Sequence, residues 1–128
     1  MKNCFILSSN AEHFLPALKG AVLPGTNREG KRYFPDGEIY VKLPEVKKMK
    51  GKRVIVVHSG LPRPNDGLIE LELILEILKE HKIKPEVFFT YFPYGRQDEV
   101  FEDGETNAAK AIVQKLTDYY KVKKIYAI

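Results

Sequence analysis

An amphipathic segment between two short apolar runs is the sequence feature that most restricts the fold. Leucines recur at helical spacing between residues 68 and 78, and four glutamates between residues 70 and 80 supply a polar face. Asp66 precedes them at the position of an N-cap. The flanking runs Arg53–His58 and Glu86–Phe92 are rich in β-branched and aromatic residues, as strands are. This order predicts two parallel strands joined by a right-handed crossover.

The same alternation continues in both directions along the chain. A second helix is expected from Ala108 to about Tyr119, with Thr106 as its cap, before a strand at Lys124–Ile128. Another strand is expected at Cys4–Ser8. Together these segments predict an α/β fold, with a mostly parallel sheet that carries helices on both faces.

Two further features add to this sheet. Ser9 and Glu12 have capping-box spacing and predict a first helix, although Pro16 would disrupt a longer one. The segments Lys31–Phe34 and Glu38–Leu43 are joined by Pro-Asp-Gly, which is typical of a tight turn. We therefore expect a hairpin that is added to the sheet.

Length and composition fit one ordinary domain. The 128 residues are too few for two typical domains, and 44% hydrophobic with 30% charged residues argues against disorder. No apolar run approaches the roughly 18 residues of a membrane span, and the N-terminus lacks a secretory signal. We therefore expect a cytoplasmic protein that does not associate with membranes. The single cysteine, Cys4, is expected to be a small buried hydrophobic residue.

The net charge of +4 comes from lysine clusters at residues 47–53 and 121–124. No aromatic residues are interleaved with them for stacking, so solvated edges are favoured over a nucleic-acid surface. Gly20 and Gly25 have the spacing of a phosphate-binding loop, but Thr26 and Asn27 stand where Lys and Ser or Thr are required. The histidines have no partners at metal-ligand spacing, which favours structural roles. They are His13, His58 and His81.

Ligands of open α/β sheets bind beyond the carboxyl ends of the parallel strands. This rule points to Ser59–Asp66 and Pro93–Glu105. In the second stretch, Arg96 could hold phosphate oxygens bidentately while Gln97 fixes orientation, although a loop arginine is more often an ordinary surface residue.

The turn between the hairpin strands presents an aromatic ring and two carboxylates. Phe34 could stack on a base, and Asp36 or Glu38 could accept hydrogen bonds from the exocyclic amine of an adenine. Gly37 completes the turn. From spacing alone, a plain hairpin turn with solvated acids is the favoured interpretation.

Taken together, three segments resemble the N-terminal domain of ribose-phosphate pyrophosphokinase, also called phosphoribosyl pyrophosphate synthetase. They are Phe34–Glu38, the Ser59 loop with Asn65 and Asp66, and Tyr91–Asp98. The resemblance covers nearly the whole chain and implies a phosphoribosyltransferase-like fold. It also implies transfer of the diphosphoryl group of ATP to ribose 5-phosphate, with magnesium, in a homo-oligomer.

The resemblance implies roles for the candidate residues. Phe34, Asp36 and Glu38, with Gly37 in the same turn, would contact the adenine of ATP bound to a neighbouring subunit. Arg96 and Gln97 would hold ATP in their own subunit. The site would therefore lie at a subunit interface.

Two departures from the family pattern limit this expectation. Family members carry Lys or Arg after the Arg-Gln-Asp motif, whereas residues 99–103 here include Glu99, Glu102 and Asp103, which should repel a polyphosphate. The chain also stops where the family continues into its metal-binding segment and second domain. The chain alone is therefore expected to be inactive, and the alternative is a non-catalytic homologue that binds and regulates a full-length synthetase.

Overall fold

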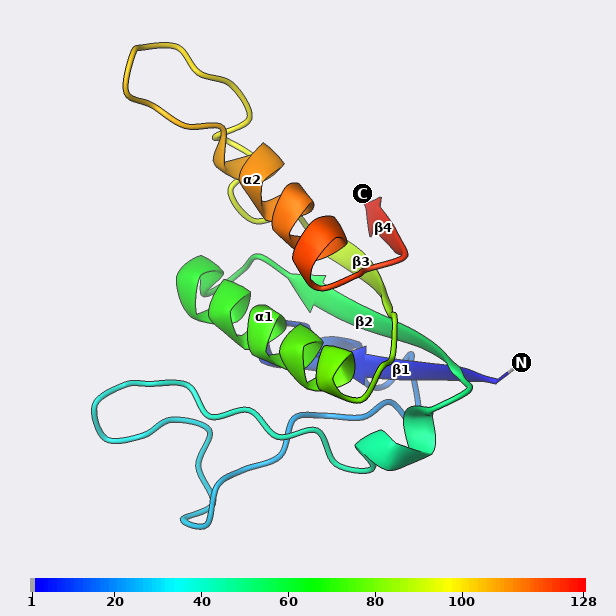
Figure 1. The fold of residues 1–128 in the computed structure, drawn as a ribbon. Coiled ribbons are helices and arrows are strands. Elements are labelled where there is room, and N and C mark those ends of the chain that lie inside the picture. The colour runs from blue at the N-terminus through cyan, green and yellow to red at the C-terminus, as the bar shows by residue number, and fades with distance from the viewer. Residues whose placement is uncertain (1) are drawn as a thin grey trace.

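The structure is a computed structural model, which describes residues 2–128 and contains one parallel sheet with strand order β1-β2-β3-β4 (Figure 1). The predicted α/β fold class is confirmed. The elements in chain order are β1 (Asn3–Leu7), η1 (Ser9–Phe14), η2 (Val46–Met49), β2 (Arg53–Ser59), α1 (Pro64–Glu80), β3 (Glu86–Tyr91), α2 (Ala108–Gln114), η3 (Lys115–Tyr119) and β4 (Lys124–Ala127). Among them, η1 and η2 are 3-10 helices, and η3 is a π-helix that continues α2.

The main core lies between α1 and one face of the sheet. Alternation along the strands turns Val54, Val56 and Val87 toward this face, where they pack against Leu71 and Leu75 of the helix. Each of these leucines is fully buried, which contributes about 2 kcal/mol of hydrophobic free energy per side chain. The predicted amphipathic helix is therefore confirmed, and its leucine stripe fixes it to the sheet.

Both predicted N-caps differ from the observed ones. Helix α1 begins at Pro64, two residues before Asp66, because proline has no N–H to lose and its φ is already helical. Asp66 lies in the first turn instead. For α2 the cap is Asn107, whose side chain accepts a hydrogen bond from the Lys110 amide at 2.9 Å. None of the helices within residues 2–128 has the length and apolar character needed to cross a membrane.

Both α-helices lie on the same face of the sheet (Figure 1). The prediction of helices on both faces holds only through the short 3-10 helix η1, which packs on the opposite face with Ala11 buried. The reason is the strand order. The crossovers from β2 to β3 and from β3 to β4 are right-handed and advance in one direction, which places their helices α1 and α2 on one side of the sheet.

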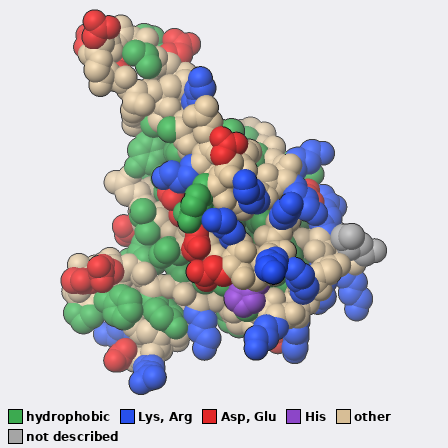
Figure 2. All heavy atoms as spheres, viewed as in Figure 1, with side chains coloured by type: hydrophobic (Ala, Val, Ile, Leu, Met, Phe, Trp, Pro, Cys, Tyr) green, Lys and Arg blue, Asp and Glu red, His purple; other side chains and the backbone are tan. Residues whose placement is uncertain are grey.

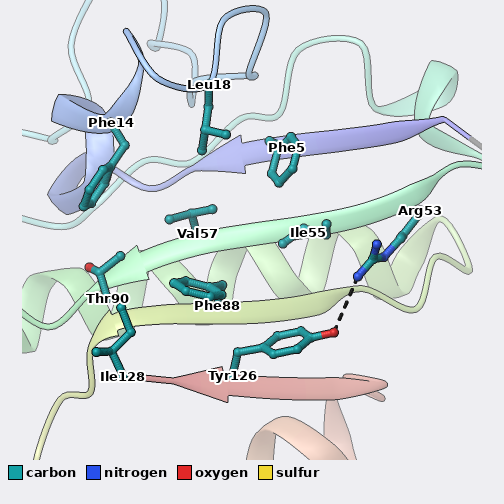
Figure 3. Close-up of a pocket in the computed structure, with 10 residues that line it drawn as sticks. All are labelled: Phe5, Phe14, Leu18, Arg53, Ile55, Val57, Phe88, Thr90, Tyr126 and Ile128. Atoms are coloured by element: carbon teal, nitrogen blue, oxygen red, sulfur yellow. Dashed lines mark hydrogen bonds between the residues drawn. The ribbon is translucent and has the colours of Figure 1, made fainter.

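The opposite face is consequently open beyond η1. A hollow of 660 Å³ lies on this face. Figure 3 shows the mostly apolar side chains that line it. At one end Glu86 accepts hydrogen bonds from Arg53 Nε at 2.7 Å and from the Tyr126 hydroxyl at 2.8 Å. These bonds lower the pKa of Glu86 to about 2. The lining residues are Phe5, Phe14, Leu18, Arg53, Ile55, Val57, Phe88, Thr90, Tyr126 and Ile128.

The predicted hairpin forms but does not join the sheet. Its two arms pair through a single antiparallel bridge, Tyr33 to Ile39, and through backbone bonds such as that from the Tyr40 amide to the Arg32 carbonyl at 2.8 Å. Residues 23–44 instead form an excursion that returns to the core at the buried Leu43. The prediction of two strands added to the sheet was wrong, because the Arg32 side chain is bonded to the Ser9 hydroxyl and the Pro24 carbonyl, and these contacts hold the arms away from the sheet.

Candidate functional site

The loops that follow β1, β2 and β3 gather at the carboxyl edge of the sheet, as predicted (Figure 1). Two of them approach each other closely at Gly60. The Gly60 amide donates to the Tyr91 carbonyl at 2.7 Å, and a Cβ atom at this position would lie 2.9 Å from Pro93 Cα. A glycine here therefore allows the β2 and β3 loops to meet.

The Phe34–Glu38 turn is closed by its own backbone. The Phe34 amide donates to the Glu38 carbonyl at 2.8 Å, and the Gly37 amide donates to the Phe34 carbonyl at 2.9 Å. Gly37 has φ of +93°, which favours glycine. The Asp36 carboxylate accepts from the Glu38 amide at 2.9 Å, so one of the two predicted acids also serves the turn itself.

The ring of Phe34 stays accessible in this turn, with 41% of its surface exposed. It packs edge-to-face against Tyr40 with ring centroids 5.9 Å apart. Glu38 is exposed and makes no side-chain hydrogen bond or ion pair within residues 2–128. A hollow of 480 Å³, which no sequence motif marks, lies beside the ring. Its lining residues are Asn27, Glu29, Lys31, Tyr33, Phe34 and Pro35.

Arg96 and Gln97 lie together in the loop after β3. They line a second hollow, of 440 Å³. The Gln97 amide donates to the Tyr94 carbonyl at 3.0 Å, and its own carbonyl accepts from the Ala109 amide at 3.1 Å, which ties the loop to α2. Tyr94 has φ of +61°, and its hydroxyl donates to the Asn65 side chain. The loop that carries Arg96 is thus held to α2 through Gln97 and to α1 through Tyr94.

The rest of this loop is acidic and exposed. Glu105 folds back and accepts hydrogen bonds from the amides of Phe101 and Glu102 at 3.0 and 3.1 Å. Within the described residues, no Lys or Arg lies within ion-pair distance of the loop acids. Figure 2 shows their carboxylates at the tip of the projecting loop, far from the lysines near the amino ends of the strands. The local potential is therefore negative beside Arg96.

The hairpin turn and the Arg96 loop do not meet within one subunit. Figure 1 shows the turn projecting beside the β1 side of the sheet, and the loop projecting beyond β3 and α2. No hydrogen bond or ion pair joins residues 34–38 to residues 95–106 in the part of the chain that the structure describes.

A polar network behind the turn was not predicted. Ser9, in η1, donates from its amide to a Glu70 carboxylate oxygen at 2.6 Å, and its hydroxyl accepts from Arg32 at 3.0 Å. The side-chain amide of Asn10 donates to the Ser59 carbonyl at 2.9 Å. No sequence motif links these residues. They come together because η1, α1 and the hairpin pack against one another.

His58 lies at the base of this network and is fully buried. Its Nδ1 is 2.7 Å from the Ser8 hydroxyl, and its Nε2 has no hydrogen-bond partner within residues 2–128. Burial lowers the pKa of His58 to about 4. The imidazole is therefore neutral at physiological pH, and its burial is compatible with the structural role that was expected.

The lysine clusters occupy the opposite end of the sheet from the candidate site. They surround a hollow of 270 Å³, where Lys50 donates to the Lys82 carbonyl at 2.9 Å and closes the end of α1. The lining residues are Lys50, Gly51, Lys52, Lys82, Ile83, Lys84 and Lys123. The cysteine predicted to be buried, Cys4, is half-buried against the main core, and burial raises the pKa of its thiol.

Comparison with known proteins identifies the relatives of this fold and site. The family model described as the N-terminal domain of ribose phosphate pyrophosphokinase matches residues 25–119. A ribose-phosphate pyrophosphokinase of Pyrococcus furiosus is 36% identical over 116 residues, which cover 90% of this chain and 39% of that protein. Those of Thermococcus kodakarensis and Pyrococcus abyssi are each 34% identical, over 95% and 100% of this chain and 42% and 43% of theirs. The chain thus spans about two fifths of the length of these relatives.

Proposed function

Because this chain belongs to the ribose-phosphate pyrophosphokinase family, in which it corresponds to the N-terminal domain, we propose that it recognises ATP and assembles subunits for diphosphoryl transfer. In this proposal the diphosphoryl group passes from ATP to the 1-hydroxyl of ribose 5-phosphate, and AMP leaves. The protein acts chiefly by positioning the reactants. The proposal rests on two separated surfaces. The Phe34–Glu38 turn is suited to a base, and the Arg96–Gln97 pair is suited to phosphates.

The Phe34–Glu38 turn supplies the base-recognition half. The exposed ring of Phe34 can stack on a purine, and the Glu38 carboxylate can accept a hydrogen bond from the adenine exocyclic amine. Asp36 contributes by holding the turn through the Glu38 amide. The backbone bonds across Gly37 fix the backbone positions from which the ring and the carboxylate project before the nucleotide arrives.

The Arg96–Gln97 pair supplies the phosphate half. A guanidinium can hold two phosphate oxygens at once, and the amide of Gln97 can orient them. Since the turn and this pair are separated within one subunit, the proposed site is shared between two subunits, and a homo-oligomer is required. Ribose 5-phosphate would bind mainly to parts of the enzyme that lie outside this chain.

Magnesium is the metal that the family resemblance implies. Within residues 2–128, no group of three His, Cys, Asp or Glu side chains is placed to hold a metal ion. The ion would supply charge neutralisation on the polyphosphate. Because magnesium is usually held by one or two carboxylates together with substrate phosphates, its protein ligands are proposed to lie in parts of the enzyme outside this chain, and we derive no step through the metal.

A second candidate function rests on the acidic loop. Glu99, Glu102 and Asp103 stand where the family pattern has cations, and an acidic loop opposes polyphosphate binding. This observation favours a non-catalytic homologue that binds and regulates a full-length synthetase. Co-purification with such a synthetase, without nucleotide binding of its own, would support this alternative.

Nucleotide binding by calorimetry tests the main proposal. We expect Phe34→Ala and Glu38→Ala each to weaken ATP binding about 5- to 100-fold, which corresponds to roughly 1–3 kcal/mol for a lost stacking or charged hydrogen bond. The unfolding midpoint should stay unchanged, because both side chains are exposed. Glu80→Ala, which removes an exposed carboxylate on α1 away from the turn, is the matched control. ATP binding that is absent, or equal in all variants, would contradict the proposal.

A further inference from the structure

The Phe34–Glu38 turn lies at the tip of an excursion that has few attachments of its own. Its arms share one antiparallel bridge, and the turn residues are exposed. The excursion is fastened at its base by the bond from the Gly25 amide to the Lys42 carbonyl at 2.8 Å. Between base and tip, the orientation of the turn depends on a side-chain contact to the rest of the fold.

We propose that Glu70 and Arg32 are positioning residues, which hold the Phe34–Glu38 turn in a fixed orientation through Ser9. The assignment of the turn to adenine recognition rests on the function proposed above. The orientation itself does not, because it follows from contacts within the chain.

Arg32 makes the contact from the hairpin side. Its Nη1 donates to the Ser9 hydroxyl at 3.0 Å and forms an ion pair with Glu12, and its Nη2 donates to the Pro24 carbonyl at 2.9 Å. The Arg32 carbonyl accepts from the Tyr40 amide on the other arm. One residue therefore fastens both arms, two residues from the turn. A guanidinium can make these bonds at fixed angles, whereas a lysine ammonium cannot.

Glu70 makes the contact from the helix side. It lies on the core-facing side of α1 and is only 5% exposed. Both of its carboxylate oxygens accept from Ser9, one from the amide at 2.6 Å and the other from the hydroxyl. The Ser9 hydroxyl thus donates to Glu70 and accepts from Arg32, which joins α1, η1 and the hairpin in one continuous series of bonds.

The anchor at the far end of this series is rigid. Ser9 is two residues beyond the end of β1, and the intervening Ser8 donates from its amide to the Val57 carbonyl at 3.1 Å. Asn10, next to it, is buried and donates to the Ser59 and Arg63 carbonyls at 2.9 and 3.0 Å. The carboxylate of Glu70 therefore holds the hairpin to the sheet itself and not to a mobile loop.

If stability alone mattered, a buried carboxylate would be unfavourable at position 70. Burial of a charged group lowers stability unless its partners compensate, and an apolar side chain would pack against the neighbouring core more favourably. Through Ser9, the Glu70 carboxylate is linked to Arg32 and can fix the direction of the hairpin, which a leucine could not do. Tyr33 adds weaker contacts, because its hydroxyl reaches Asp66 only at 3.5 Å and the Arg63 guanidinium lies 5.9 Å from its ring centroid.

Amide hydrogen exchange on the full chain tests the orientation directly and without nucleotide. Arg32→Lys and Glu70→Gln should raise the exchange of residues 33–40 at least about tenfold while exchange in β2 stays unchanged. The controls are Arg28→Lys in the same excursion and Glu80→Gln on the same helix, both exposed and without ion-pair partners within residues 2–128. Unchanged exchange in residues 33–40, or a rise equal to that in β2, would overturn the proposal.

A nucleotide measurement gives the second readout. If the turn contacts the base and Arg96 contacts phosphates, Arg32→Lys should lower ATP affinity several-fold and leave GTP affinity unchanged, because a disordered turn reduces the competent population. If Arg32→Lys raises exchange in the turn but leaves the ratio of ATP to GTP affinity unchanged, the positioning role is supported. The same result would contradict adenine recognition by the turn. A wild-type chain without nucleotide affinity would refute the proposed function, while exchange alone would still decide the positioning role.

Discussion

At the residue scale, neighbouring side chains decide what each functional residue type does. Asp36 and Glu38 are indistinguishable as acids of one turn in the sequence. In the structure Asp36 accepts a hydrogen bond from the Glu38 amide, whereas Glu38 makes no side-chain bond within the described residues. The acidic turn could therefore be predicted from the sequence. The different roles of Asp36 and Glu38 could not, because they depend on backbone geometry that residue spacing does not specify.

His58 gives a prediction at this scale. Its folded pKa of about 4 is below the ordinary value of 6.5, so the unfolded chain binds a proton first as the pH falls. Stability is complete above about pH 7, falls as the pH drops through 6.5, and stops falling from this cause near pH 4. Between about pH 8 and pH 5 the loss should be about 2 kcal/mol.

Urea unfolding at a series of pH values measures this dependence. His58→Gln should remove most of the slope between about pH 7 and pH 5, whereas His13→Gln, at an exposed position, should leave it unchanged. A wild-type stability that is constant across this range would contradict the neutral, buried state of His58.

At the scale of elements, strongly periodic segments could be predicted and irregular ones could not. The four sheet strands lie within a residue of their predicted bounds, because their apolar residues match the burial that a parallel sheet provides. The arms around Phe34 have a strand-like composition but become an excursion, since tertiary contacts such as Arg32 with Ser9 hold them away from the sheet. Contacts between residues far apart in sequence leave no mark in local spacing.

The meeting of two loops at Gly60 predicts a steric effect. In Gly60→Ala the new methyl group would lie within 3.1 Å of three Pro93 atoms, two of them backbone, so the β2 and β3 loops must separate. We expect a loss of about 1–3 kcal/mol in unfolding free energy. Chemical denaturation measures it, with Gly95→Ala as the control, because its Cβ would make only an ordinary contact at 3.7 Å. Equal stability of the two variants would show that the loops do not pack as closely as described.

The acidic loop predicts an electrostatic effect on nucleotide binding. Glu99→Lys replaces a repelling charge beside Arg96 by an attracting one and should raise ATP affinity several-fold at low salt. The gain should shrink as salt is added. Glu80→Lys, the same charge change on α1, should have little effect. Calorimetry at two salt concentrations compares the ATP affinities of the two variants. An equal gain in affinity from both would show that only net charge matters.

At the scale of the whole molecule, strand order explains both the fold and the placement of the site. Because the order β1-β2-β3-β4 never reverses, α1 and α2 cover one face, and the hollow beside Phe88 and Tyr126 stays open on the other. Alternation of strands and helices predicts the fold class but not this order. The same order places the Phe34 turn and the Arg96 loop at opposite ends of the carboxyl edge.

The central claim is that these two surfaces come from different subunits and bind one ATP. The direct measurement is ATP binding by a mixture of two variants, Phe34→Ala with Glu38→Ala in one and Arg96→Ala with Gln97→Ala in the other. Neither variant alone should bind ATP tightly, but an equal mixture should recover about a quarter of the wild-type sites, where an intact turn meets an intact loop. A mixture that binds no more ATP than the separate variants would contradict the shared site.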